Sequence, residues 1–248
     1  VTLNGYTDPG GWGSSVYGGK SANASADVKT GNTLNVTASG NTASGGVHNF
    51  EKMKFVLSSA INSGDVMLST SFGDAYDWGN ITVEGAAPWV ASKKTGEHLN
   101  RSQRVILSNG AVALSGTPWK TTDGGNIEYG LSANGTTSAT QLYFDVNQFK
   151  NANITLTTIP SATQVYAGTS TLGNDVTKNK LSVTGINVTG KTLYGGYNQS
   201  STGNATNNEL VVSGAPATSG YNYLYGGYTV NGNATNNTVT LNGFTDSG

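Results

Sequence analysis

The sequence predicts an all-β protein in which short strands stack as successive coils of a parallel β-solenoid. The first observation is a repeat. Residues 193–214 and 224–243 share an aliphatic residue, Tyr-Gly-Gly-Tyr, Asn-Ala-Thr-Asn-Asn, a short strand and Gly. The second is the alternation of apolar and polar residues within each strand, and the third is the Asn and Gly residues at the strand ends. A unit of this size cannot bury a hydrophobic face alone, so it must stack on its neighbours.

The repeat recurs along the chain at a regular spacing. The Asn that opens each strand is Asn179, Asn208 and Asn237, and these positions lie 29 residues apart, as do the glycines that close the strands. Weaker copies lie at 165–185 and 16–40. At this spacing the chain makes roughly eight to nine coils, with strands of neighbouring coils about 4.8 Å apart.

The two ends of the chain enter the repeat at the same point. Residues 1–5 match residues 239–243 exactly in type, and each is followed by an aromatic residue, Thr and Asp. We therefore expect a segment of a longer array, in which residues 1–248 form a single solenoid. Its expected parts are regular coils at 1–46, irregular coils with longer loops at 47–160 and regular repeats at 161–248.

The asparagines predict a column of side chains within the stack. Apolar residues such as Leu210 and Val212 share one parity, which predicts one buried face for each strand. Asn and Gly adopt positive φ more readily than other residues, so they suit the sharp corners between strands. Asn side chains at equivalent corners bond to one another along a stack. We therefore predict a ladder of Asn179, Asn208 and Asn237.

The tyrosines near the start of each repeat form a second predicted column. Tyr166, Tyr194 and Tyr225 each follow an aliphatic residue that we expect to face the core. Because neighbouring residues of a strand point to opposite faces, these rings are predicted to stack on the outer surface. Tyr17 joins the column if the register continues through the central region. The alternative is that the tyrosines point inward.

The composition excludes several classes of protein. Of 248 residues 35 are Gly, about twice the usual share, and only 11% are charged. The polar surface must therefore consist of Ser, Thr, Asn and Gly. A net charge of −1 gives no indication of nucleic-acid binding. The absence of Cys excludes disulfides and thiolate chemistry.

The central region holds the main cluster of charge. Residues 47–160 contain short strand-like runs separated by Gly, Asn and Asp. Residues 86–104 are expected to form a long loop, which either protrudes to contact a partner or is charged simply to stay soluble. A short helix over 94–104 fits the pattern as well. The candidate binding residues are Trp89, Lys93, Lys94, His98, Arg101 and Arg104. Trp12, Trp78 and Trp119 are weighed as anchors against the simpler role of filling the core.

The sequence contains little that indicates catalysis. His48 and His98 are the only histidines, which excludes a multi-histidine metal site, and there is no G-x-S-x-G elbow. We expect no catalytic residue, metal or cofactor. The motif at 123–126 is interpreted as a turn rather than a calcium loop. Hydrolysis by two carboxylates remains an alternative. Its candidates are Asp74, Asp77, Glu84, Glu128 and Asp145.

The repeats resemble the passenger repeats of Gram-negative autotransporters, the type V secreted adhesins. The resemblance rests on the VYGG and LYGGY motifs, on NATNN followed by an alternating strand and Gly, and on residues 48–70. It covers roughly half of the chain and implies a right-handed parallel β-helix, the hand that parallel crossovers prefer. It also implies export through a C-terminal outer-membrane barrel, which lies outside this segment, and display at the cell surface. No binding residue of the family transfers to this chain.

These observations lead to one functional hypothesis and two alternatives. The chain is expected to be a non-catalytic adhesin or stalk segment on the surface of a Gram-negative bacterium. Its expected partner is a surface protein or glycan of a host or bacterial cell, and we favour a monomer. One alternative is a polysaccharide lyase or hydrolase on the same scaffold, with carboxylates converging in a lateral cleft. The other is a trimeric fibre with an apolar outer stripe.

Overall fold

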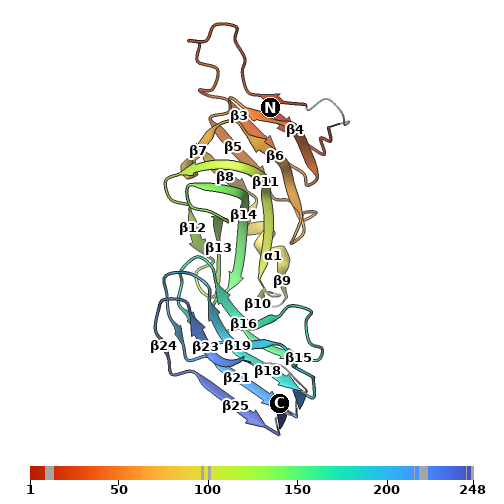
Figure 1. Cartoon of the computed structure of the whole chain (residues 1–248), viewed down its shortest axis with the longest axis vertical. Helices are drawn as coiled ribbons and strands as arrows, with labels where there is room; N and C mark the ends of the chain where they lie inside the picture. The colour runs from red at the N-terminus through yellow and green to blue at the C-terminus, as the bar shows by residue number, and fades with distance from the viewer. Residues whose placement is uncertain are drawn as a thin grey trace. The chain divides into compact units, whose positions relative to one another are not determined.

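The protein is a β-solenoid. The computed structural model describes residues 1–8, 14–95, 98–99, 102–214, 216–217, 223–243 and 245–246. The chain is 5% helical, and its stacked parallel strands form a solenoid of about 8 turns, which confirms the predicted fold class. The strands fall into two compact units (Figure 1). Unit 1 comprises Val1–Lys94, Gln103–Thr121 and Gly130–Val146, and unit 2 comprises Thr95–Ser102, Thr122–Tyr129 and Asn147–Gly248.

Unit 1 begins with two parallel sheets, one on each side of the coil. The first sheet is β1 (Thr2–Leu3), β3 (Thr33–Val36), β5 (Lys52–Val56) and β8 (Ile81–Glu84). The second contains β2 (Val16–Tyr17), β4 (Asn41–His48), β6 (Val66–Phe72) and β11 (Gln103–Ser115). The short strand β7 (Ala75–Asp77) also pairs in parallel with β11.

The second sheet then changes direction. Strand β14 (Ser138–Gln148) pairs with β11 in the antiparallel sense, with two register shifts along the pair. Strands β13 (Ile127–Ala133) and β12 (Lys120–Thr122) continue the sheet beyond β14. The central region is therefore built partly from antiparallel strands, which need only a tight connection where parallel strands need a full crossover.

The segment after β8 contains regular elements where a loop was expected over 86–104, of which residues 96–97 and 100–101 lie outside the described residues. A 3-10 helix spans Trp78–Asn80, and α1 spans Ala86–Lys93, earlier than the helix expected over 94–104. Pro88 is tolerated because it lies in the first turn of α1. Strands β9 (Lys94–Thr95) and β10 (His98–Leu99) then pair with each other. No helix among the described residues has the length and apolar character needed to cross a membrane.

Unit 2 contains the regular repeats, and the described strand pairs of these repeats are parallel. The first sheet is β15 (Asn153–Leu156), β18 (Lys180–Thr184), β21 (Glu209–Ser213) and β25 (Thr238–Asn242). The second is β16 (Gln164–Ser170), β19 (Thr192–Asn198) and β23 (Tyr223–Thr229). The smaller sheets are β17 (Val176–Thr177), β20 (Ala205–Thr206) and β24 (Ala234–Thr235), and β22 (Pro216–Ala217) with β26 (Thr245–Asp246).

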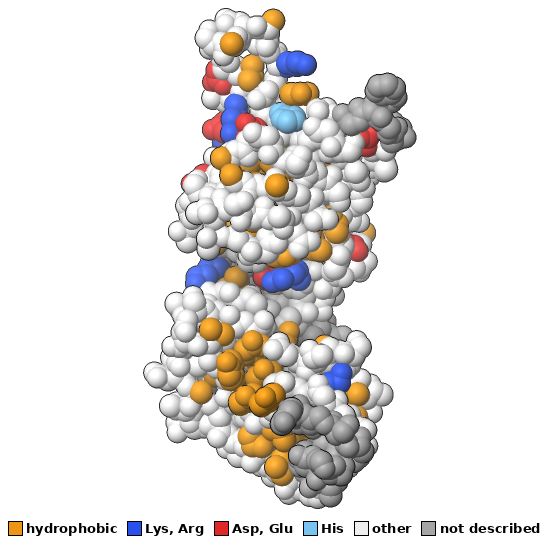
Figure 2. Space-filling view, in the orientation of Figure 1, with side chains coloured by type: hydrophobic (Ala, Val, Ile, Leu, Met, Phe, Trp, Pro, Cys, Tyr) orange, Lys and Arg blue, Asp and Glu red, His pale blue; other side chains and the backbone are white. Residues whose placement is uncertain are grey.

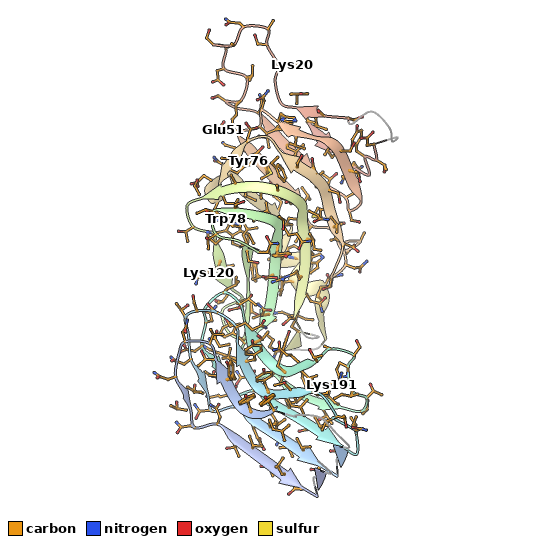
Figure 3. The ribbon with its side chains drawn as sticks, in the orientation of Figure 1. Lys20, Glu51, Tyr76, Trp78, Lys120 and Lys191 are labelled. Carbon is orange, nitrogen blue, oxygen red and sulfur yellow. The ribbon has the colours of Figure 1, made fainter. Side chains whose placement is uncertain are left out.

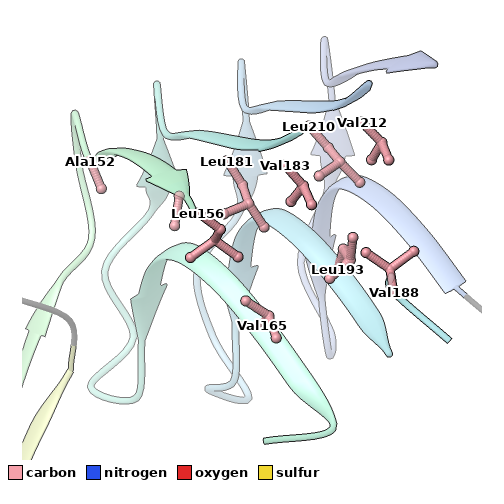
Figure 4. Packing of buried hydrophobic residues seen from close by; sticks show 10 residues of the cluster. Ala152, Leu156, Val165, Leu181, Val183, Val188, Leu193, Leu210 and Val212 are labelled. Carbon is pink, nitrogen blue, oxygen red and sulfur yellow. The ribbon is translucent and has the colours of Figure 1, made fainter. Parts of the chain in front are cut away.

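The core of unit 2 is a set of aliphatic columns (Figure 4). Leu181 and Leu210 are register partners and are fully buried, and Leu193 of the facing sheet packs into the same cluster. Burying each of these side chains contributes about 1.5–3 kcal/mol. In β25, the last strand of its sheet, Val239 and Leu241 keep the same parity but are 41% and 49% exposed. The alternation therefore predicts the orientation of these side chains, whereas their burial depends on a neighbouring coil.

The corners of unit 2 use the left-handed backbone region in register. Lys178, Asn207 and Asn236 have φ of 57°, 56° and 55°, each one residue before a predicted ladder asparagine. The strand-closing glycines adopt the same region, as in Gly214 at 55°. Positive φ is least costly for Gly and Asn. The prediction of Asn and Gly corners therefore holds for Asn207, Asn236 and the closing glycines, but Lys178 occupies the first of these corners. The bend falls one residue before each ladder asparagine, whose side chain points inward.

Candidate binding face

The interior of unit 2 holds a continuous asparagine ladder. Asn179 Nδ2 donates to Asn208 Oδ1 at 2.9 Å, and Asn208 Nδ2 donates to Asn237 Oδ1 at 3.1 Å. Each of these Oδ1 atoms also accepts the backbone N–H of the preceding asparagine, at 3.1 and 2.9 Å. Asn179 and Asn208 are each 1% exposed. Because buried amides are costly unless they are paired, the ladder holds successive coils in one register.

The ladder explains the second glycine of the Tyr-Gly-Gly motif. A Cβ on Gly196 would lie 2.5 Å from the Asn208 side chain. The equivalent distances are 2.3 Å from Gly168 to Asn179 and 2.4 Å from Gly227 to Asn237. Any larger residue would therefore displace the ladder amide. The motif places an aliphatic residue and a glycine toward the interior and leaves its tyrosines on the outside.

The outer side of β16, β19 and β23 is a grid of nine side chains. Register pairs Tyr166 with Tyr194 and Tyr194 with Tyr225, and it aligns the other outward positions in the same way. We call the result the tyrosine face. Its three rows across the coils are Gln164, Thr192 and Tyr223; Tyr166, Tyr194 and Tyr225; and Thr169, Tyr197 and Tyr228. The number of tyrosines therefore rises from one to two to three along successive coils.

The rings of the tyrosine face pack closely. Tyr194 stacks on Tyr225 at 5.2 Å between centroids and 11° between planes, and on Tyr197 at 4.5 Å and 10°. Tyr228 is turned across its neighbours, at 68° to Tyr197 and 60° to Tyr225. Offset-stacked and edge-to-face pairs of this kind are the favoured aromatic geometries. The face is therefore a rigid aromatic cluster.

Exposure of the tyrosine face increases toward β23. Tyr194 is buried at 5%, whereas Tyr228 and Tyr223 are 37% and 54% exposed. Figure 2 shows the corresponding hydrophobic patch on unit 2. Burial, with smaller contributions from Tyr197, Tyr225 and Tyr228, raises the pKa of Tyr194 to about 12. Burial and the neighbouring Tyr228 also raise the pKa of Tyr197. The phenols of Tyr194 and Tyr197 therefore remain neutral at physiological pH and retain their O–H donors.

Tyr17 does not belong to this column. It lies in unit 1 and stacks on His48, with 5.0 Å between ring centroids and 21° between planes. Lys20 Nζ lies 5.1 Å from the Tyr17 ring centroid. Tyr17 is 39% exposed. Tyr17 therefore occupies the equivalent position in the motif, but its ring stacks on His48 rather than on another tyrosine.

The charged candidates of the central region have internal partners. Trp89 is 1% exposed and donates Nε1–H to the Ile61 carbonyl at 2.8 Å, so it presents no surface to a partner. Lys93 Nζ lies 5.2 Å from the Trp89 ring centroid. Arg104 binds Asp145 through Nε at 2.5 Å and Nη2 at 2.9 Å.

The structure describes the remaining members of that set only in part. Lys94 begins β9. His98 lies in β10, but its side chain, like all of Arg101, is outside the described residues, as is Trp12. Trp78 is 4% exposed and packs in unit 1 (Figure 3), and Trp119 packs against Phe144 at 6.2 Å between centroids.

Two carboxylates proposed for hydrolysis are buried and saturated with donors. Glu128 is 0% exposed in unit 2. Five groups donate to it at 2.7–3.2 Å: Asn147 Nδ2, Ser170 Oγ, Thr171 N, Leu172 N and Asn174 Nδ2. Asp145, in unit 1, accepts from Arg104 and from Ser132 Oγ at 2.5 Å. Both carboxylates hold strands and loops together.

The remaining carboxylates also have separate roles. Asp74 accepts the backbone N–H of Asn49 at 2.6 Å. Asp77 caps the 3-10 helix through Gly79 N at 2.8 Å, and Glu84 pairs with Lys54 at 3.0 Å. Asp123 accepts three backbone N–H groups, at Gly125, Asn126 and Ile127, which makes residues 123–126 a turn. Among the described residues, no group of three or more His, Asp or Glu side chains is arranged to hold a metal ion.

The sequence predicted a column of Tyr166, Tyr194 and Tyr225, but it did not predict the other three tyrosines of the face, Tyr197, Tyr223 and Tyr228. Strict alternation puts Tyr197 and Tyr228, three residues after Tyr194 and Tyr225, on the opposite side of the strand. The strand alternation breaks at the Gly-Gly pair, so both tyrosines of each motif emerge on one side. The signal available in the sequence was the repetition of the full Tyr-Gly-Gly-Tyr motif.

Fold and site together define a β-solenoid with an aromatic lateral face. No family model, curated protein or solved structure matches this chain. The tyrosine face and the repeat are therefore the features of this chain that bear on its function.

Proposed function

We propose that this chain is a surface-displayed passenger segment of a Gram-negative autotransporter that acts as a non-catalytic adhesin. It attaches bacteria to a host cell or to one another by binding a surface protein or glycan, as a monomer and without a cofactor. The observation that carries the proposal is the tyrosine face, a cluster of six outward tyrosines on one side of a repeat solenoid. The repeat motifs supply the link to the autotransporter family.

The physical properties of this face suit attachment. Tyrosine provides a large, rigid and amphipathic contact area at a low cost in side-chain entropy, and it is enriched in binding surfaces. Tyr228 and Tyr223 are exposed while their neighbours hold them in place. A solenoid whose stability is a sum of neighbour contacts holds such a face firmly without a single large core.

The separate partners of the carboxylates support a non-catalytic role. Retaining and inverting glycosidases need two carboxyl groups about 5–10 Å apart across one bond. Glu128 and Asp145 instead each accept several internal donors, and neither side chain is exposed.

Cell attachment tests the proposal directly. The chain is displayed on a non-adherent bacterial strain, and attachment to cultured epithelial cells and to sister bacteria is counted. A variant with Tyr223→Thr and Tyr228→Thr carries at both positions the residue found in the same rows of earlier coils, Thr192 and Thr169. We expect it to lose most attachment. Tyr17→Thr, which removes the exposed tyrosine of the related motif in unit 1, should retain it. Equal attachment by all three proteins would refute the proposal.

A further inference from the structure

We propose that the tyrosine face binds an uncharged polysaccharide chain laid along the stack of coils. This inference rests on the proposed function and specifies its ligand. Three properties of the face support it: the absence of ionic groups among its nine positions, the chemistry of its rings and their repetition from coil to coil.

The face contains no ionic group. Its nine positions are occupied by six tyrosines, two threonines and one glutamine. Lys191, which immediately precedes β19 (Figure 3), donates Nζ to the carbonyl oxygens of Ser161 and Ala162 at 3.0 Å each. A ligand that carries ionic groups would lose hydration here without gaining an opposite charge. The face therefore selects a neutral ligand.

Each exposed ring combines an apolar surface with a hydroxyl group. Sugar rings have the same dual character, with C–H faces that pack on aromatic rings and hydroxyls that exchange hydrogen bonds at their edges. Gln164, which is exposed, and Thr192, which is partly exposed, add neutral donors and acceptors in the same grid, whereas Thr169 is buried. The face thus offers each sugar unit both an apolar contact and hydrogen-bonding partners.

The repetition of the face favours a polymer over a single sugar. The ring centroids of Tyr197 and Tyr228, on successive coils, lie 5.6 Å apart, whereas Tyr194 is buried beneath its neighbours. A chain of repeating units meets an equivalent ring at each coil, so weak contacts add up along its length. A protein partner offers no such repetition, and we treat it as the competing outcome.

Affinity electrophoresis measures the interaction. The chain is run in native gels that contain hydroxyethylcellulose, galactomannan, amylose or dextran, with alginate as the anionic comparison. We expect retardation by at least one neutral polymer and none by alginate. Retardation should persist when the salt is raised from about 0.05 M to about 0.5 M, because a neutral ligand has no charge to screen.

Variants connect the retardation to the face. Tyr223→Thr with Tyr228→Thr should weaken the apparent affinity at least about 10-fold, the scale expected when aromatic anchors are removed. Tyr17→Thr should bind like the parent chain. Circular dichroism and thermal unfolding establish that both variants are folded. If the double variant is unfolded, Tyr228→Thr alone is measured, with an expected loss of several-fold.

Several results would overturn the inference. These are the absence of retardation by every neutral polymer, retardation that the tyrosine substitutions leave unchanged, and binding that salt abolishes. Periodate oxidation of target-cell glycans separates this inference from the proposed function. Tyrosine-dependent attachment that survives periodate but is lost after protease treatment identifies a protein partner. That result would support the adhesin function and refute the polysaccharide ligand. Attachment that is unchanged by the tyrosine substitutions refutes the proposed adhesin function of this face.

Discussion

Both units contain a Tyr-Gly-Gly motif followed by a short strand, but they differ at the residue that immediately precedes this strand. In unit 2 the residue that precedes β18, β21 and β25 is an asparagine in each case, and the side-chain amides of these three asparagines bond to one another. In unit 1 Asn32 occupies that position, and its Nδ2 donates to the carbonyls of Val28 and Asn49 at 2.7 and 3.3 Å. Its register neighbour in the next coil is Glu51 (Figure 3), which accepts Gly31 N instead. Asn32 therefore has no asparagine beside it in the next coil, and the described residues of unit 1 form no asparagine ladder at this position.

The difference shows what keeps a solenoid regular. Where the ladder continues, every strand pair is parallel, and Lys180, Glu209 and Thr238 repeat the 29-residue spacing. Where it stops, coil lengths vary and the sheet accepts the antiparallel strand β14 beside β11. A buried amide column penalises a change of register, because every slipped coil leaves unpaired polar groups. Without it, aliphatic packing alone tolerates insertions.

The largest expected effect comes from removing the ladder. Asn208→Leu leaves the backbone N–H of Asn179 and one of the two N–H groups of its Nδ2 without an acceptor in the core, while the other keeps the Phe149 carbonyl. We expect a loss of about 4 kcal/mol in the free energy of unfolding of unit 2, since each buried unpaired group costs about 1–3 kcal/mol. Urea unfolding, followed by hydrogen exchange in each unit, measures the loss.

The matched control for this substitution is Asn32→Leu in unit 1. Asn32 is only partly buried and supplies two hydrogen bonds to carbonyl oxygens. We expect a loss of about 1 kcal/mol, confined to unit 1. Equal losses from the two substitutions would contradict the special role of the ladder.

The glycine that accommodates the ladder gives the next effect. Gly196→Ala brings a methyl group to 2.5 Å from the Asn208 side chain. Overpacking of this kind costs about 2–3 kcal/mol. Gly125→Ala is the control, because a Cβ there meets nothing within 4 Å. Thermal unfolding should separate the two variants clearly, and a Gly196→Ala protein as stable as the control would show that the amide column can shift without cost.

Alkaline pH should weaken unit 2 through its tyrosines. Burial raises the pKa of Tyr194 from 10.0 to about 12, so the folded state holds its proton more tightly than the unfolded state. This stabilising contribution is complete below pH 10 and is lost as the pH rises toward 12. Urea unfolding across this range measures the decline, and Tyr194→Phe should make it shallower. A parent chain with constant stability between these pH values would contradict the assigned burial.

The smallest effect is expected where the units resemble each other. Lys180 pairs with Glu209 across coils of unit 2, and Lys54 pairs with Glu84 across coils of unit 1, both at 3.0 Å and on exposed side chains. Lys180→Ala and Lys54→Ala should each change the free energy of unfolding by about 0.5 kcal/mol or less. A larger change in only one unit would mean that surface charge also distinguishes them.

Sequence reasoning located the repeated parts of the fold and misjudged the unrepeated part. The spacing of Asn179, Asn208 and Asn237 was sufficient to predict their column, because equal steps in a stack place equal residues together. Residues 86–104 have no second copy, and their charge was interpreted as a loop. Trp89 and Val90 are instead buried by packing against the coil, which makes α1 a helix.

The sequence by itself determined the coil length, the inward and outward parity of the strands and the positions that require Asn or Gly. These properties are local or periodic, so they can be predicted from the order of residues along the chain. Only the tertiary structure decided that Tyr197 and Tyr228 join the outer face, that β14 reverses the sheet and that Glu128 and Asp145 are held by internal donors. Each of these depends on which distant segments meet, and that is settled by packing and buried hydrogen bonds rather than by spacing along the chain.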